Sequence, residues 1–434
     1  MKNIKKVISA LVFLLCILFV DLSYGQSIVL GQDKHFEQKT LKVPYAFYNE
    51  AYGAAVGYVY GLSGAPQDQA TMLATVMAGT HGSYTFYAME RDIQVPFLKR
   101  LFVDTDLLFG QYGELRSYTD GNPRYPNERA GNNDSNKDDY IDGDGHDYLI
   151  RLKLKYLLPI GHGKDEIIST QILDRGLLSY GEVGGTAWNP LKSGKTYIET
   201  RLYARNQEVD SRYVKREQKA RAFELALFWE NTDFPYNPSK GNTLRLRFSR
   251  DWGDLDSTAP WTVIDGEYTH YISLGTSERF RERVIAFDVW TADALTWDSS
   301  HTEGGKEVFH RPPAYAGATL GGLFKMRGFP LNRFSDQAAI YYCAEYRMIP
   351  KWNPLADITW VQKYLEIAWW QWVPFVEVGR VAPTWTINEL HTDMQWDVGF
   401  GIRAMAKGLV VRVDTAVSEE DYGLQMMIGH PFQF

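Results

Sequence analysis

The chain has 434 residues, of which 45% are hydrophobic, 14% aromatic and 23% charged, so composition excludes both a disordered chain and a helical membrane protein. The net charge of −7, with no clustered basic face, excludes a nucleic-acid-binding surface. Cys343 is the only cysteine after residue 25, which excludes an intramolecular disulfide and a cysteine-based metal site in the mature chain.

The first 25 residues have the pattern of a secretory signal peptide. Three lysines stand among the first six residues, an apolar run covers residues 7–20, and Ser23-Tyr24-Gly25 forms a small-x-small cleavage site. The alternative is a transmembrane anchor, which needs about 20 apolar residues and is therefore longer than this run. We predict an exported chain with a signal peptide over 1–25.

The rest of the chain divides into short alternating runs separated by turn residues, which is typical of β-strands. In the run 409–417, Val411 and Val413 share one face, whereas Arg412 and Asp414 share the other. A charge at every second position does not fit the dry core of a soluble β-sandwich, the alternative all-β fold, but fits a water-filled barrel interior. We predict an all-β fold, a 16-stranded antiparallel transmembrane β-barrel. The predicted strands are 54–62, 70–78, 83–92, 100–109, 148–157, 167–178, 196–205, 222–229, 243–252, 262–274, 283–292, 339–348, 366–378, 395–405, 409–417 and 422–432.

Strand parity then predicts the topology. If both termini lie in the periplasm, the segment between the strands 283–292 and 339–348 follows strand eleven and starts outside the cell. The same count places the long polar segment 113–147 after the fourth strand, on the periplasmic side, where connections are normally short, so either this is a long inner connection or the strand count is wrong at this point.

The segment after strand eleven contains a glycine-punctuated loop with a single arginine, Arg327, at its centre. A barrel of this size has an interior too wide for its wall side chains to fill, so a long loop can fold into the lumen. A guanidinium in that position needs carboxylates and can bind two, and we predict that Glu345 and Glu377 point inward and pair with Arg327. The alternative is an exposed loop arginine without a partner. The other residues of the loop motif are Gly321, Gly322, Met326, Gly328 and Phe329.

Four stretches together resemble the barrel domain of the BamA/TamA-type outer-membrane assembly superfamily, also called bacterial surface antigens. Residues 326–329 resemble its (V/I)-R-G-(F/Y) loop, 344–347 its E-(F/Y)-R strand, and 375–379 its F-x-D-x-G strand, with Glu377 in place of Asp. Residues 230–241 resemble its D-T-R-D-N-P-x-N-P-T-R-G turn, with Glu230 and Thr232 as departures. The matching residues of this turn are Asp233, Pro235, Asn237, Pro238 and Gly241, and the residues that resemble the C-terminal signal of outer-membrane barrels are Gly429, Phe432 and Phe434.

Residues 45–57 also resemble the family's first strand. The resemblance covers residues 43–434, and it implies a barrel in the outer membrane of a Gram-negative bacterium, in contact with outer-membrane lipid. Residues 26–42 then form a short N-terminal periplasmic segment that cannot hold the family's POTRA repeats, so we expect a barrel-only member. The implied function is help in inserting or moving proteins or lipids at the outer membrane, with a separate periplasmic partner or a client protein. The alternative is a plugged or gated pore, or a binding barrel, without assembly activity.

Other candidate sites are weak. Asp134, Asn136, Asp138 and Asp142 have the one-three-five-nine spacing of a calcium loop, but Asp139 stands where such loops need glycine. A solvated acidic connection is the favoured interpretation. No Ser/His/Asp arrangement or metal-ligand spacing rises above chance, so we expect no enzyme, no cofactor and no metal, although an outer-membrane phospholipase or protease stays open as an alternative.

Overall fold

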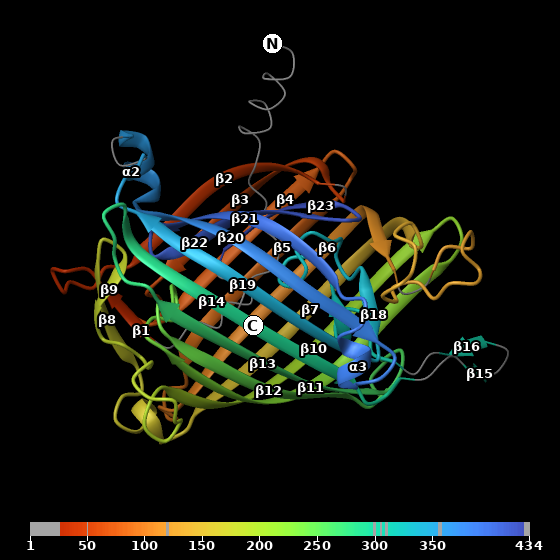
Figure 1. Cartoon of the computed structure of the whole chain (residues 1–434), viewed down its shortest axis with the longest axis horizontal. Helices are drawn as coiled ribbons and strands as arrows, with labels where there is room; N and C mark the ends of the chain where they lie inside the picture. The colour runs from red at the N-terminus through yellow and green to blue at the C-terminus, as the bar shows by residue number, and fades with distance from the viewer. Residues whose placement is uncertain are drawn as a thin grey trace, which may run out of the picture.

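The structure is a computed structural model and describes residues 27–49, 51–118, 121–297, 301–303, 306–308, 311–354 and 358–428. The predicted 16-stranded antiparallel sheet is confirmed, and its strands follow one another in chain order. The sheet is curled into a barrel with strongly tilted strands (Figure 1). Its strands are β2 (Lys39–Asn49), β3 (Gly53–Ser63), β4 (Thr71–Gly79), β5 (Tyr84–Gln94), β6 (Leu101–Ser117), β7 (Ile141–Leu157), β10 (Lys195–Ser211), β11 (Lys215–Thr232), β12 (Gly241–Asp251), β13 (Trp261–Ser273), β14 (Phe280–Ala294), β19 (Ala338–Pro350), β20 (Ile367–Ala382), β21 (Gln395–Ala406), β22 (Leu409–Ser418) and β23 (Tyr422–Ile428).

The smaller elements lie in the connections between these strands. The described helices are all too short and too polar to cross a membrane. These elements are β1 (Ser27–Leu30), η1 (Gly161–Lys164), β8 (Ser169–Asp174), β9 (Leu177–Tyr180), β15 (His301–Glu303), β16 (Lys306–Val308), β17 (Ala318–Leu320), β18 (Phe334–Asp336), α2 (Thr359–Leu365) and α3 (Ile387–Leu390).

The two faces of the sheet differ in the way that the alternation predicts. On β12, Leu246 and Phe248 are 52% and 41% exposed, whereas Arg245 and Ser249 on either side of them are buried and Arg247 between them is half-buried. The same contrast of exposed apolar and buried charged side chains recurs around the sheet. The outer face therefore suits lipid, and the inner face encloses charge.

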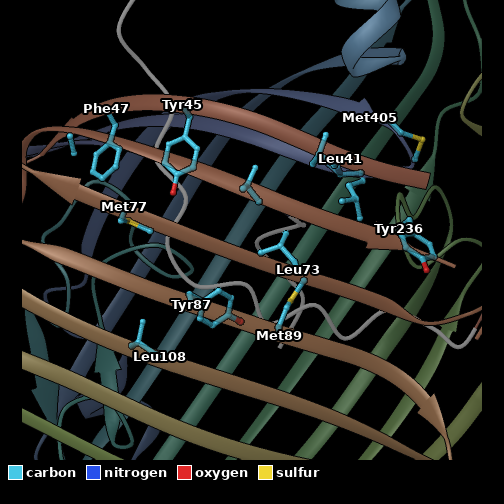
Figure 2. Packing of buried hydrophobic residues seen from close by; sticks show 14 of the residues in the cluster. Leu41, Tyr45, Phe47, Leu73, Met77, Tyr87, Met89, Leu108, Tyr236 and Met405 are labelled. Atoms are coloured by element: carbon cyan, nitrogen blue, oxygen red, sulfur yellow. The ribbon is translucent and has the colours of Figure 1, made fainter. Parts of the chain in front are cut away.

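The interior is not charged everywhere. The inner wall of β2 to β4 is largely apolar and carries Leu41, Tyr45, Leu73 and Met77 (Figure 2), whereas β5 and β6 already bury charged side chains such as Arg91 and Asp106. Strands β2 to β4 lie on the N-terminal side of the junction between the first and the last strands of the sheet.

The curling brings the two end strands, β2 and β23, to the same side of the barrel (Figure 1). Lys407, in the turn between β21 and β22, donates from Nζ to the carbonyl oxygen of Thr40 on β2 at 3.1 Å. Leu41 of β2 belongs to the same apolar cluster as Met405 and Val410 from β21 and β22 (Figure 2). We call the junction between β2 and the last strands the seam.

Two of the strand assignments were wrong, and their errors cancel in the count. The run 167–178 is not a barrel strand: it contains β8 and β9, which form a separate three-stranded sheet with β1. The first barrel strand is instead β2, which was absent from the sixteen predicted strands, although residues 45–57, which resemble the family's first strand, overlap its end. It begins before residue 43, inside the predicted periplasmic segment 26–42. The alternation in 167–178 is real, but it buries one face of a small sheet at the end of the barrel.

The corrected count also moves the long segment 113–147. Its central part connects β6 to β7, the fifth and sixth strands, so the predicted periplasmic placement was wrong. It lies at the same end as the β14–β19 connection, and the backbone N–H of Ser335 donates to Gly131 O at 2.6 Å. We call this end, where strand parity predicts the cell exterior, the outer end, and the opposite end the inner end.

Candidate functional site

The connection from β14 to β19 folds into the barrel, and we call residues 311–337 the plug loop. Its hairpin of β17 and β18 buries Leu320 and Phe334, and its tip buries Met326 and Phe329, against the inner wall formed by β14 and β19. Gly321 has φ +106°, and a Cβ there would collide with the carbonyl oxygen of Pro330, so the loop needs glycine at this bend.

Arg327, at the tip of the plug loop, is 1% exposed and binds carboxylates from three strands. Its Nε lies 3.1 Å from Glu377 Oε1, its Nη2 3.2 Å from Glu345 Oε1, and its Nη1 2.8 Å from Asp414 Oδ2. The backbone N–H of Arg327 also donates to Glu377 Oε2 at 2.6 Å. The structure thus brings together Arg327, Glu345 and Glu377, and adds Asp414 as a partner that the sequence analysis missed.

The neighbouring charges complete a buried network around these carboxylates. Arg347 and Arg403 each donate to Glu345, at 2.8 and 2.7 Å. Arg412 donates to Asp414, and Tyr341 donates its hydroxyl to Glu377. Buried charges are stable only when paired and hydrogen-bonded in this way.

The stretch 375–379 on β20 shows why its residue types are needed. The ring of Phe375 lies under the Arg327 guanidinium, with 3.4 Å from Cζ to the ring centroid. Glu377 pairs with the same group, and a Cβ on Gly379 would approach Leu320 and Met326 of the plug loop to 2.9 and 3.2 Å. On this inward face, Phe375 thus stacks on the guanidinium and Glu377 pairs with it, while Gly379 leaves room for the plug loop.

The backbone at the tip is held as well. Gly328 N–H donates to Asp397 Oδ2 on β21 at 3.0 Å, and Ser418 Oγ donates to Gly328 O at 2.9 Å. Gln425 on β23 donates from Nε2 to Arg327 O at 3.1 Å. Together with the side-chain pairs, these contacts tie the tip to all five strands from β19 to β23.

A second buried arginine, Arg333, holds the base of the plug loop, and the sequence analysis missed it. Its Nε and Nη2 each lie 2.7 Å from an oxygen of Glu420, in the β22–β23 connection. Its Nη1 donates to Ser135 Oγ at 2.9 Å and its Nη2 to Ser135 O at 2.6 Å. The outer connections of β6–β7 and β22–β23 are therefore fastened to the plug.

The calcium candidates do not form a site. Asp134, Asn136, Asp138 and Asp142 are all exposed, and the carboxylates of the three aspartates do not cluster within the described part of the chain. The group that does gather there is His146, Glu208 and Glu217, on neighbouring strands. Both carboxylates of this group already form ion pairs with lysines, since Lys215 Nζ lies 2.7 Å from Glu208 and Lys219 Nζ lies 3.1 Å from Glu217.

The inner end is covered by the sheet of β1, β8 and β9. Its strands β8 and β9 follow β7 in the chain, yet Gly176 O, in the turn between them, accepts a hydrogen bond from Trp369 Nε1 on β20 at 2.9 Å. Arg281 on β14 donates to Asp174 O at 3.2 Å. Because β20 lies far around the barrel from β7, the sheet spans the inner mouth.

The turn between β11 and β12 is folded around Asp233. Asp233 Oδ1 accepts the N–H groups of Phe234 and Ser239, both at 2.9 Å. Asn237 donates to Glu282 on β14 at 2.8 Å and accepts from Gln371 on β20 at 3.3 Å. Pro235 and Pro238 flank Asn237 in this turn, and Gly241 has φ +100° at the start of β12.

The predicted signal peptide, residues 1–25, and the C-terminal Gly429, Phe432 and Phe434 lie outside the described residues.

The sequence matches no family model and no curated protein. Among solved structures, CdiB from Escherichia coli is similar with a TM-score of 0.51 and 11% identity, over 90% of this chain and 61% of that one. CdiB from Acinetobacter baumannii (TM-score 0.49, 10% identity, 90% and 59% covered) and BamA from Haemophilus ducreyi lacking POTRA domains 1–3 (0.47, 12%, 91% and 70%) are also similar. This chain spans about three fifths of the two CdiB chains. The chain therefore has the barrel fold of CdiB from Escherichia coli, in agreement with the superfamily resemblance that its sequence motifs carry.

Proposed function

We propose that this chain is a plugged outer-membrane barrel that assists the insertion or translocation of proteins, or of lipids, at the outer membrane of a Gram-negative bacterium. The observation that supports this best is the placement of the plug contacts. The tip of the plug loop is tied to β19, β20, β21, β22 and β23, and these strands end at the seam.

This placement suggests how such a barrel would work. The five strands and the plug form one body stiffened by buried charge, whereas the opposite side of the seam is the largely apolar wall of β2 to β4. Opening at the seam would expose the backbone groups of edge strands, which can pair with a strand of a client protein. No catalytic step is needed, so the proposal does not make this chain an enzyme.

A gated pore without assembly activity is the second candidate. Its support is the presence of closures at both ends, the plug loop at the outer end and the β1–β8–β9 sheet at the inner end. Both closures would have to move before solutes could pass.

Depletion of the protein, followed by a quantitative census of outer-membrane proteins and lipids, tests the assembly proposal. We expect specific outer-membrane components to fall on depletion and to recover with the wild-type gene. Complementation with Arg327→Ala should give less recovery than complementation with Arg124→Ala, a matched change at an exposed loop arginine. An unchanged census after complete depletion would remove the assembly proposal and leave the pore. If the census does fall, co-purification with the native protein would identify the periplasmic partner or client that the assembly proposal requires.

A further inference from the structure

The outer wall of the barrel is hollowed over β11 to β14. A groove of about 820 Å³ opens there, and we call it the wall groove. Its floor follows one rung of the sheet, in which Leu227, Leu246, Gly266 and Thr291 are successive cross-strand neighbours. The next rung toward the outer end brings in Phe248, Ile264 and Asp293.

Gly266 makes the hollow, and nothing in its surroundings requires a glycine. It lies in the middle of β13, where glycine weakens a strand and normally marks a special backbone conformation or a close neighbour. Its φ is not in the left-handed region, and a Cβ would meet only Leu246 Cδ2 at 3.3 Å and Arg245 O at 3.8 Å. By contrast, a Cβ at the strand glycines Gly57 or Gly399 would strike the ring of Tyr45 or Phe375.

Two polar groups at the outer end of the groove make this end chemically different from the rest. Trp385, from the connection after β20, lies across the top and donates from Nε1 to Thr291 Oγ1 at 2.7 Å. Asp293 lines the same end, with its Oδ1 buried and the Gln337 side chain as a hydrogen-bond partner of the carboxylate. An apolar channel thus leads to a carboxylate, whose negative charge favours a cationic donor.

We propose that the wall groove binds an acyl chain of a membrane lipid whose headgroup carries an ammonium group. The groove is continuous with the exposed apolar belt of Leu225, Leu227, Leu246, Phe248 and Ile264, so its occupant is apolar along its length. The ammonium group donates to Asp293 at the headgroup level, where charge and hydrogen bonding favour it. This inference rests on the proposed location in a membrane and deepens the role of lipid as a partner.

Lipid retention by the purified full-length barrel tests this. The protein is delipidated in detergent, offered an equimolar mixture of phosphatidylethanolamine and phosphatidylcholine, and examined by native mass spectrometry. The wild type is expected to retain one lipid and to prefer phosphatidylethanolamine, because the choline headgroup has no N–H donor. Gly266→Leu fills the groove and should reduce retention about tenfold, the loss expected when roughly two methylene groups lose their contacts.

Ala88→Leu is the matched control, because it enlarges a side chain on the same lipid-facing side of the sheet at β5, away from the groove. Its lipid retention should equal that of the wild type, and the heat-dependent gel mobility of both variants reports whether they fold. Asp293→Asn should retain lipid but lose the preference for phosphatidylethanolamine. Equal retention by folded Gly266→Leu and wild type, or an equal loss in Ala88→Leu, would overturn the acyl site. An unchanged preference in Asp293→Asn would overturn the headgroup assignment. The outer-membrane census is a separate readout, so failure of the assembly proposal would not produce any of these results.

Discussion

Replacing Arg327 with alanine is expected to lower the free energy of unfolding by roughly 3–5 kcal/mol, the usual loss when one partner of a buried ion pair is removed. The loss falls mainly on Glu377. Glu345 keeps Arg347 and Arg403, and Asp414 keeps Arg412, whereas the ion pairs of the described residues give Glu377 only Arg327. Urea unfolding of the barrel in lipid vesicles measures the effect.

Two further variants separate this explanation from a general effect of losing an arginine. Arg124→Ala, at an exposed loop position, should change the free energy of unfolding by no more than about 0.5 kcal/mol. The double variant Arg327→Ala/Glu377→Gln should recover part of the loss, because the uncompensated carboxylate is replaced by a neutral amide. A loss below about 1 kcal/mol in Arg327→Ala would mean that the network behaves like a surface pair.

The second large effect concerns conductance in planar bilayers. The wild type should conduct weakly because both mouths are covered. Residues 296–336 can be replaced with a short glycine-serine turn, because Asp293 and Ala338 are already paired neighbours on β14 and β19. Removal of the plug should raise the conductance only in part, because the β1–β8–β9 sheet still covers the inner mouth. The current through two constrictions in series is limited by the narrower one.

Replacing residues 168–181 as well should give the largest conductance, above the sum of the increases from the two single replacements. A matched replacement inside the largely exposed segment 186–192 should leave the conductance at the wild-type level. A wild type that already conducts like the double variant would contradict closure at both ends and would favour the constitutive pore.

The fold was readable from the sequence where one face of a strand meets lipid and the other meets charge. The runs 243–252 and 409–417 show this alternation because every second residue is charged. The sequence was misread where a strand lies at a boundary. Strand β2 carries Thr40, Lys42 and Pro44 on its outward face beside the seam, so this face is too polar to resemble a lipid-facing strand.

The run 167–178 was wrongly assigned to the barrel because its alternation comes from packing in a different sheet. Ser169, Gln171 and Leu173 on β8 are buried on one face, so 167–178 alternates like a barrel strand although it packs across the inner mouth. Alternation reports that one face of a strand is buried. It does not report which larger sheet the strand joins.

The candidate site was predictable in part. Arg327, Glu345 and Glu377 stand in motifs, so their meeting could be anticipated from the resemblance. Asp414 was recognised on a polar face, and the number of donors on a guanidinium was the signal that a third carboxylate would be needed. Arg333 gave no signal, because Ser135 and Glu420 come from loops far along the chain and share no spacing with it.

The most direct test of the account uses Cys343, the only cysteine after residue 25. Its side chain is buried on the inner wall of β19, and its Sγ lies 3.5 Å from Arg327 Nη2, behind the tip of the plug loop. The rate of modification by a water-soluble, membrane-impermeant maleimide is measured on the membrane-inserted protein. The account predicts a protected thiol in the wild type and rapid modification in folded Arg327→Ala. Equal rates in the two proteins, or faster modification by a lipid-soluble reagent than by the water-soluble one, would contradict a lumen closed by this loop.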